Sequence, residues 1–190
     1  MKQIHSFDAV HDSQRLFRLL LRAMSNPLQK VDVCAYTDKL YGADKAFLAI
    51  AFTLLDNELT FCSFENEMLD DSIQSLTLAE KASCAEADFI FAGNTSALFY
   101  AIAHAKTGTA ADPHKSATII ARIGSDEDAT LTMSGPGIDG TVSLVADPLV
   151  IDAVKLRDEM GFEYPQGIDL IFVDGRNHLF AIPRLAKKEG

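Results

Sequence analysis

The chain has 190 residues, of which 48% are hydrophobic, and a net charge of −10. This length suffices for one domain with a sizeable core, so we expect residues 1–190 to form a single domain. The acidic balance argues against nucleic acid and anionic membranes as partners, because both attract basic surfaces.

The first half of the chain alternates predicted helices and strands. Asp12 can cap a helix that runs to about Ser25, and Asn26-Pro27 ends it. Asp44 and Thr95 are the expected caps of two later helices. The other elements predicted here are strands at 31–36, 59–64 and 88–92 and helices at 44–55, 69–81 and 95–105.

The second half is richer in strands. A loop at 106–116 precedes strands at 117–123, 130–133 and 141–145, and an acidic turn at 125–128 joins the first two. Pro148 suits the first turn of a helix that runs to about Met160 and stops at Gly161. Alternation followed by clustered strands predicts an α/β fold with a mixed sheet and flanking helices.

The C-terminal segment predicts a β-hairpin. Strands at 168–173 and 178–182 flank a turn in which Gly175 can adopt a positive φ. Asp169 interrupts the first apolar strand, and an arginine such as Arg184 is its natural partner. Two interpretations remain open. The preferred one pairs these side chains with each other or across a subunit interface, and the other makes Arg184 an anion clamp for a phosphorylated sugar.

Other polar residues have both functional and ordinary structural interpretations. Arg15, Arg18 and Arg22 share one face of the first helix, which predicts a solvated face, a phosphate site or a contact with acids of a partner subunit. His104 and Lys106 could assist acid–base chemistry, but the dipole of a helix end explains them as well, and we prefer that interpretation. Residues 135–140 match G-x-G-x-x-G, but a strand-like sequence follows them, so we expect a turn between strands.

No cofactor or metal is expected. Cys34, Cys62 and Cys84 are widely spaced without a C-x-x-C pair, which indicates neither zinc nor disulfides. The sequence contains no G-x-S-x-G elbow and no P-loop. The N-terminus lacks the apolar core of a signal peptide and 46–55 is too short to span a bilayer, so we expect a cytoplasmic protein.

Two motifs at opposite ends of the chain resemble the PhnH family, the H subunit of the bacterial carbon–phosphorus (C–P) lyase core complex. The family patterns are P-x-G-I-D-L-I with A-I-P-R, and F-R-x-L-L-x-A-M-S-x-P-G. The matching residues are Pro165, Gly167-Ile168-Asp169-Leu170-Ile171, Ala181-Ile182-Pro183-Arg184, Phe17-Arg18, Leu20-Leu21, Ala23-Met24-Ser25 and Pro27. Leu28 stands where the second pattern ends in glycine, so a glycine-specific turn is not assumed there.

The resemblance implies an α/β homodimer similar to the large domain of pyridoxal-phosphate (PLP) dependent transferases, but without a PLP site. Neither Lys81 nor Lys106 has a phosphate-cup motif beside it. It also implies assembly with G, I and J subunits and singles out Arg18 as a motif residue. The J subunit carries the iron–sulfur step, and this chain has no three-cysteine motif for such a centre.

The resemblance further implies a function in organic phosphonate catabolism. The subunit supports transfer of ribose triphosphate from ATP onto a phosphonate, which forms α-D-ribose 1-methylphosphonate 5-triphosphate, and it is expected to be non-catalytic alone. Two alternatives stay open: a stand-alone PLP- or nucleotide-phosphate-binding transferase, and a ligand-sensing module outside the complex.

Overall fold

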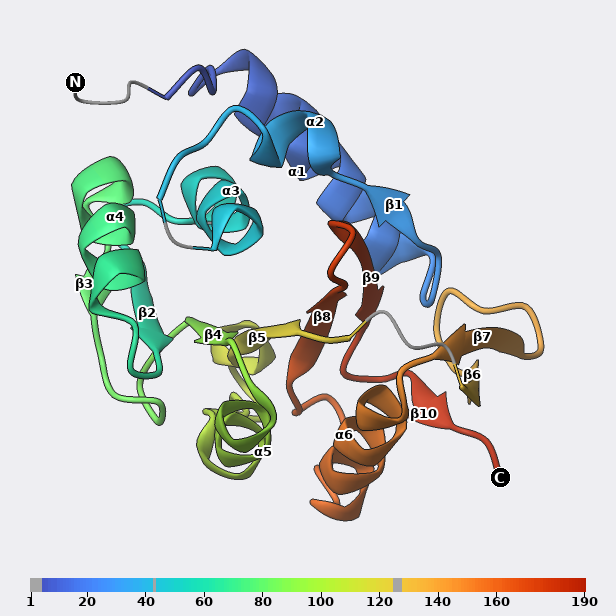
Figure 1. The fold of residues 1–190 in the computed structure, drawn as a ribbon. Coiled ribbons are helices and arrows are strands. Elements are labelled where there is room, and N and C mark those ends of the chain that lie inside the picture. Colours follow the sequence, from blue (N-terminus) through green and yellow to red (C-terminus); the bar gives the residue numbers. More distant parts are fainter. Residues whose placement is uncertain (1–4, 43, 125–127) are drawn as a thin grey trace.

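The computed structural model describes residues 5–42, 44–124 and 128–190. Its centre is a seven-stranded mixed sheet (Figure 1). In spatial order the strands are β1 (Val31–Asp32), β9 (His178–Ile182), β8 (Asp169–Val173), β5 (Thr118–Arg122), β4 (Phe89–Ala92), β2 (Thr60–Ser63) and β3 (Glu80–Lys81). A smaller antiparallel sheet contains β10 (Lys187–Lys188), β6 (Ala129–Ser134) and β7 (Val142–Ala146). The predicted α/β class with a mixed sheet is confirmed.

Helices cover both faces of the large sheet (Figure 1). On one face lie α1 (His11–Ser25), α3 (Lys45–Leu54) and α4 (Glu67–Thr77), with the short α2 (Cys34–Thr37) beside them. On the other face lie α5 (Thr95–His104) and α6 (Pro148–Glu159). Successive strand residues serve the two cores in turn, since Ile171 packs with the first helices and Phe172 with the second.

Five neighbouring strands, β3, β2, β4, β5 and β8, run parallel. Beyond them, β9 pairs antiparallel with β8, and β1 pairs antiparallel with β9. The chain leaves β2 through α4 towards β3, and leaves β4 through α5 towards β5, in the opposite direction along the sheet. The carboxyl ends of β2 and β4 therefore form a topological switch point, where open α/β sheets commonly bind ligands.

Two of the three expected caps differ from the prediction. Asp12 is buried within the first turn of α1, whose N-cap position is Val10. Asp8, in the turn before the helix, accepts the N–H groups of Val10 and His11. Asn94, not Thr95, caps α5, because its Oδ1 accepts the Ala97 N–H at 2.9 Å. The cap expected of Asp44 is confirmed, since it accepts the N–H groups of the second and third residues of α3.

Two predicted elements are wrong in extent. The strand expected at 31–36 stops at Asp32, whose Oδ1 accepts the Cys34 N–H and turns the chain into α2. The helix expected to reach Lys81 ends at Thr77, whose hydroxyl accepts the Ala79 N–H at 3.1 Å. Lys81 then belongs to the edge strand β3.

The loops also differ in detail. The loop expected at 106–116 contains the short 3-10 helix η1 (Pro113–Lys115). The strands β5 and β6 belong to different sheets, and most of the acidic turn expected between them (125–127) lies outside the described residues. The hairpin β8–β9 is confirmed, but its left-handed residue is Asn177 (φ 60°) and not Gly175.

Leu28 adopts the left-handed backbone conformation that the resemblance would assign to a glycine. Its φ is 65°, its side chain is buried, and its N–H donates to the Ala181 carbonyl at 3.1 Å. This turn passes the chain from the end of α1 to the edge strand β1, which pairs with β9. A left-handed leucine costs about 1–2 kcal/mol, which burial of the side chain offsets.

Candidate functional site

The two motif residues of the C-terminal hairpin, Asp169 and Arg184, form an ion pair. Asp169 opens β8 with its side chain 8% exposed, and Arg184 follows Pro183 at the end of β9. The Arg184 Nη2 lies 2.5 Å from Asp169 Oδ2, and both its Nε and its backbone N–H donate to Oδ1. Arg184 Nη1 donates to the Pro113 carbonyl of η1. The guanidinium thus ties β8, β9 and η1 together.

A second arginine, Arg157 of α6, holds the segment that follows. Its side chain is 1% exposed. Its Nη1 and Nη2 donate to the carbonyls of Pro183 and Ala186, and its Nε and Nη2 donate to Asp158 Oδ1. The other Asp158 oxygen accepts the Lys188 N–H at 3.1 Å. Together, Arg157 and Arg184 clamp the C-terminal segment to the helix and to the sheet, and we call the two residues the C-terminal clamp.

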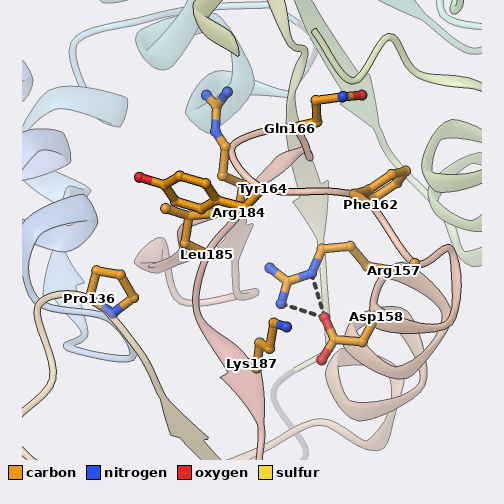
Figure 2. A pocket seen from close by; sticks show the side chains of 10 residues that line it. Pro136, Arg157, Asp158, Phe162, Tyr164, Gln166, Arg184, Leu185 and Lys187 are labelled. Carbon is orange, nitrogen blue, oxygen red and sulfur yellow. Dashed lines mark hydrogen bonds and ion pairs between the residues drawn. The ribbon is translucent and has the colours of Figure 1, made fainter. Parts of the chain in front are cut away.

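A pocket of about 310 Å³ lies beside the C-terminal clamp (Figure 2). Phe162, Tyr164 and Leu185 supply apolar walls. Figure 2 shows the Lys187 side chain directed towards the Arg157–Asp158 pair and the Arg184 guanidinium directed away from it. Arg157 and Arg184 are paired with Asp158 and Asp169, so the exposed cation that lines the pocket is Lys187. The pocket could hold a small ligand, but the geometry does not make Arg184 its anion clamp.

A shallower hollow of about 520 Å³ lies at the switch point. Phe64 and Glu65 reach it from the end of β2, and Thr95 and Ser96 from the first turn of α5. Tyr100, one turn further along α5, places its ring 5.8 Å from that of Phe64. The first N–H groups of a helix have no partner within it and favour anions, so this hollow has the chemistry to accept a phosphate beside an aromatic wall.

The arginines of α1 lie apart from both hollows. Arg15, Arg18 and Arg22 are exposed, and none forms an ion pair within the described residues. The only acid within the helix, Asp12, is buried and pairs with Lys39 at 2.7 Å. The structure therefore does not bring Arg18 together with Asp169 and Arg184.

The lysines considered for Schiff-base chemistry are both engaged in ion pairs. Lys81 lies 2.5 Å from the buried Asp70, which also accepts a hydrogen bond from Ser63, and Asp70 raises the pKa of Lys81. Lys106 lies 2.5 Å from Asp88. A lysine side chain held in an ion pair is a poor nucleophile, which argues against either lysine as a covalent PLP anchor.

The cysteines and histidines show no catalytic arrangement among the described residues, where no cluster of metal-binding side chains occurs. Cys62 and Cys84 are buried neighbours: the hydrogen bond between them lowers the pKa of Cys62 and raises that of Cys84. His104 stacks on Tyr100 at 4.1 Å, where its Nδ1 lies 2.9 Å from the Tyr100 carbonyl.

Sequence reasoning missed Arg157 and the switch-point hollow. The partners of Arg157 are carbonyls 26 and 29 residues away, so no local sequence pattern predicts these hydrogen bonds. The hollow depends on the order of the strands in the sheet, which no local sequence pattern predicts. One sequence signal could have found Arg157. By helical spacing it lies on the apolar face of α6, together with Val150, Ala153 and Val154.

Residues 5–189 match the model of the family described as bacterial phosphonate metabolism protein (PhnH). The chain belongs to the PhnH family. A relative from Stutzerimonas stutzeri, named C-P lyase subunit protein HtxG, is 28% identical over 172 residues, which cover 90% of this chain and 83% of the relative. The two motifs of the PhnH family thus lie in two different settings: Arg184 and Asp169 inside the fold, and Arg18 on its surface.

Membership of the PhnH family connects the chain to phosphonate metabolism. Within the residues that the structure describes, no helix is long and apolar enough to cross a membrane. The C-terminal clamp gives the arginine of the A-I-P-R motif a structural role. That arginine and the aspartate of the preceding motif satisfy each other.

Proposed function

We propose that the chain is a non-catalytic subunit of a C–P lyase core complex that acts in organic phosphonate catabolism. In this role it is a cytoplasmic homodimer that binds G-, I- and J-type subunits. It supports transfer of ribose triphosphate from ATP onto a phosphonate. The PhnH family match and the relative named as a C–P lyase subunit support this proposal.

The observation that favours a supporting role is the internal use of the motif side chains. Asp169 and Arg184 bond to each other and to the backbone, so they offer little to a substrate. A subunit of this kind contributes its surfaces and its shape. We also propose that its fold is similar to the large domain of PLP-dependent transferases, in keeping with a largely parallel sheet covered on both faces.

Co-purification tests the proposal. Tagged chain expressed with the G, I and J subunits of its host should retain all three through affinity and sizing steps. Phosphonate-dependent growth should be lost on deletion of its gene and restored by the intact chain. A chain that retains none of the subunits at any salt concentration would contradict the proposed role.

Arg184→Met separates a role of the motif pair within the fold from a role at a subunit interface. If the pair holds the fold, the variant unfolds more easily, but folded protein still dimerises and joins the complex. If the pair lies at an interface, dimerisation and assembly fail in protein that is still folded. Circular dichroism together with sizing and light scattering distinguishes these results.

The switch-point hollow favours a second candidate function, that of a nucleotide-phosphate-binding transferase. A ligand that binds only folded protein raises its stability by about 2.7 kcal/mol at a hundredfold excess over Kd. ATP or PLP should then raise the melting temperature, and Ser96→Glu, which places a carboxylate at the α5 N-terminus, should abolish the shift. Lys155→Glu on the outer side of α6 is the control. No shift with either ligand and no visible band with PLP would remove this candidate.

A further inference from the structure

We propose that the outer surface formed by α1 and α4 is a face for a second copy of this chain, with α1 of each copy against α4 of the other. The inference rests on the proposed homodimer and adds where the copies meet and which side chains hold them. Figure 1 shows both helices in one layer over the sheet, with α3 between them.

Exposed apolar side chains are concentrated on these two helices. Ten large hydrophobic residues are exposed in the described part of the chain, and five of them lie on α1, α4 or their caps. They are Val10, Phe17 and Leu21 on the first helix and Met68 and Leu78 on the second. Monomeric proteins rarely gather apolar side chains in this way unless something covers them.

The first half of the face is a basic and apolar surface on α1. Phe17 and Leu21 are one turn apart and about half exposed, at 47% and 53%. Arg18 and Arg22 are also one turn apart, on the neighbouring strip of the helix. The arginines have no ion pair within the described residues, although the whole chain carries a net charge of −10. They are therefore available to acids of another molecule.

The second half is an acidic and apolar surface on α4. Glu67 and Asp71 are exposed and one turn apart, the same spacing as Arg18 and Arg22. Met68 is 69% exposed. The cap residue Leu78 is 71% exposed and has a left-handed φ of 63°, where glycine or asparagine is usual. An exposed leucine in that conformation gains nothing in the monomer, but it would gain burial in a dimer.

Charge complementarity identifies the occupant as a second copy. The cationic surface of α1 fits the acidic surface of α4, and both belong to this chain. A two-fold axis near α3 would bring each α1 onto the partner's α4, so that the contact occurs twice and closes. Two molecules that each carry −10 repel each other at long range, so these local contacts must supply the attraction.

Charge exchange tests the proposal by sedimentation velocity of the full-length chain. Arg18→Glu and Asp71→Lys each place like charges together, so each should raise the dimer dissociation constant roughly tenfold or more. The double variant Arg18→Glu/Asp71→Lys exchanges the charges and should recover most of that loss. Leu78→Asp should weaken the dimer without recovery. Lys155→Glu and Asp152→Lys, the same reversals on the exposed side of α6, should leave the constant within about twofold.

Thermal unfolding of each variant confirms that it is folded, as expected for exposed positions. A monomeric wild type at micromolar concentration, single variants that dimerise normally, or a double variant that recovers nothing would each overturn the proposal.

Retention of the G, I and J subunits is measured in parallel. A dimer unaffected by the variants in a chain that still retains the subunits overturns this face and leaves the proposed function standing. A chain that dimerises as described but retains no subunit overturns the function alone.

Loss of subunit retention in Arg18→Glu with an unchanged dimer constant would assign α1 to another subunit, and would also overturn the proposal.

Discussion

The arginines of the C-terminal clamp and those of α1 have opposite environments. Arg157 and Arg184 donate hydrogen bonds to Asp158, to Asp169 and to backbone carbonyls of the same chain. The α1 arginines are exposed and have no ion pair among the described residues. Both groups neighbour family motifs in the sequence. What separates them is whether the fold brings acceptors within reach.

The difference predicts different energetic roles. Removing one partner of a buried ion pair leaves an unsatisfied charge and is costly, whereas an exposed charge contributes little to stability. The C-terminal clamp should therefore matter for folding and the α1 arginines for association. We therefore expect the motif at the C-terminal end to serve the fold and the motif on α1 to serve the proposed partner contact.

The largest expected effect comes from Arg157→Met. It leaves two carbonyls and most of the Asp158 carboxylate without their donors, which should cost about 3–5 kcal/mol in urea unfolding. Lys155→Met, on the exposed side of the same helix, is the control and should change stability by less than about 0.5 kcal/mol. If Arg157→Met cost no more than its control, the C-terminal clamp would not be structural.

The Asp169–Arg184 pair should show strong coupling. Arg184→Met and Asp169→Ala should each destabilise the fold by about 2–3 kcal/mol, and the double variant by clearly less than their sum. A double-mutant cycle in urea gives the coupling energy directly. Additive costs would mean that each side chain acts through other partners, such as the Pro113 carbonyl.

The hairpin and its ion pair could be predicted because their signals are local. Asp169 breaks an apolar strand, and a strand ending in Pro-Arg offers the nearest cation once the hairpin forms. The buried α3 was predictable for the same reason, since its apolar run and its cap Asp44 are adjacent in sequence.

The wrong predictions concern places where a side chain bonds to a backbone group close in sequence, or where a strand pairs with a segment far away in sequence. Asp32 ends its strand by bonding to the Cys34 N–H, which competes with continued pairing. The sequence pattern predicts Lys81 in a helix, yet pairing with β2 makes it a strand residue. The switch-point hollow and the two halves of the proposed dimer face exist only after the helices take their places on the sheet, so no sequence window contains them.

Leu28, between α1 and the C-terminal hairpin, tests whether the left-handed turn is strained. Leu28→Ala loses the buried side chain and keeps the left-handed strain, so it should cost about 2–4 kcal/mol. Leu28→Gly loses the same side chain but relieves the strain, so it should be about 1 kcal/mol more stable than the alanine variant. Urea unfolding of both variants gives the two free energies of unfolding that are compared. An alanine variant at least as stable as the glycine variant would show that the turn carries no such strain.

Acid should weaken the one internal ion pair of α1. The Lys39 ammonium and the Asp8 N–H lower the pKa of Asp12 below its usual value. Because the folded pKa is lower than the unfolded one, the contribution is complete above about pH 4 and disappears as pH falls through the folded pKa. Stability measured between pH 5 and 2.5 should fall less steeply in Asp12→Asn than in the wild type. The exposed Asp152→Asn, as control, should follow the wild-type curve.

The smallest effect on folding is expected from the α1 arginines, and it should depend on protein concentration. At nanomolar concentration, where a dimer dissociates, Arg18→Ala should change the free energy of unfolding by less than about 0.5 kcal/mol. At micromolar concentration the wild type gains stability from association, and the variant should fall behind it, because a partner that binds only folded protein stabilises by mass action. Unfolding monitored by fluorescence at both concentrations tests this. A cost that is the same at both concentrations would place Arg18 with the C-terminal clamp, as a residue that holds the fold and not a partner.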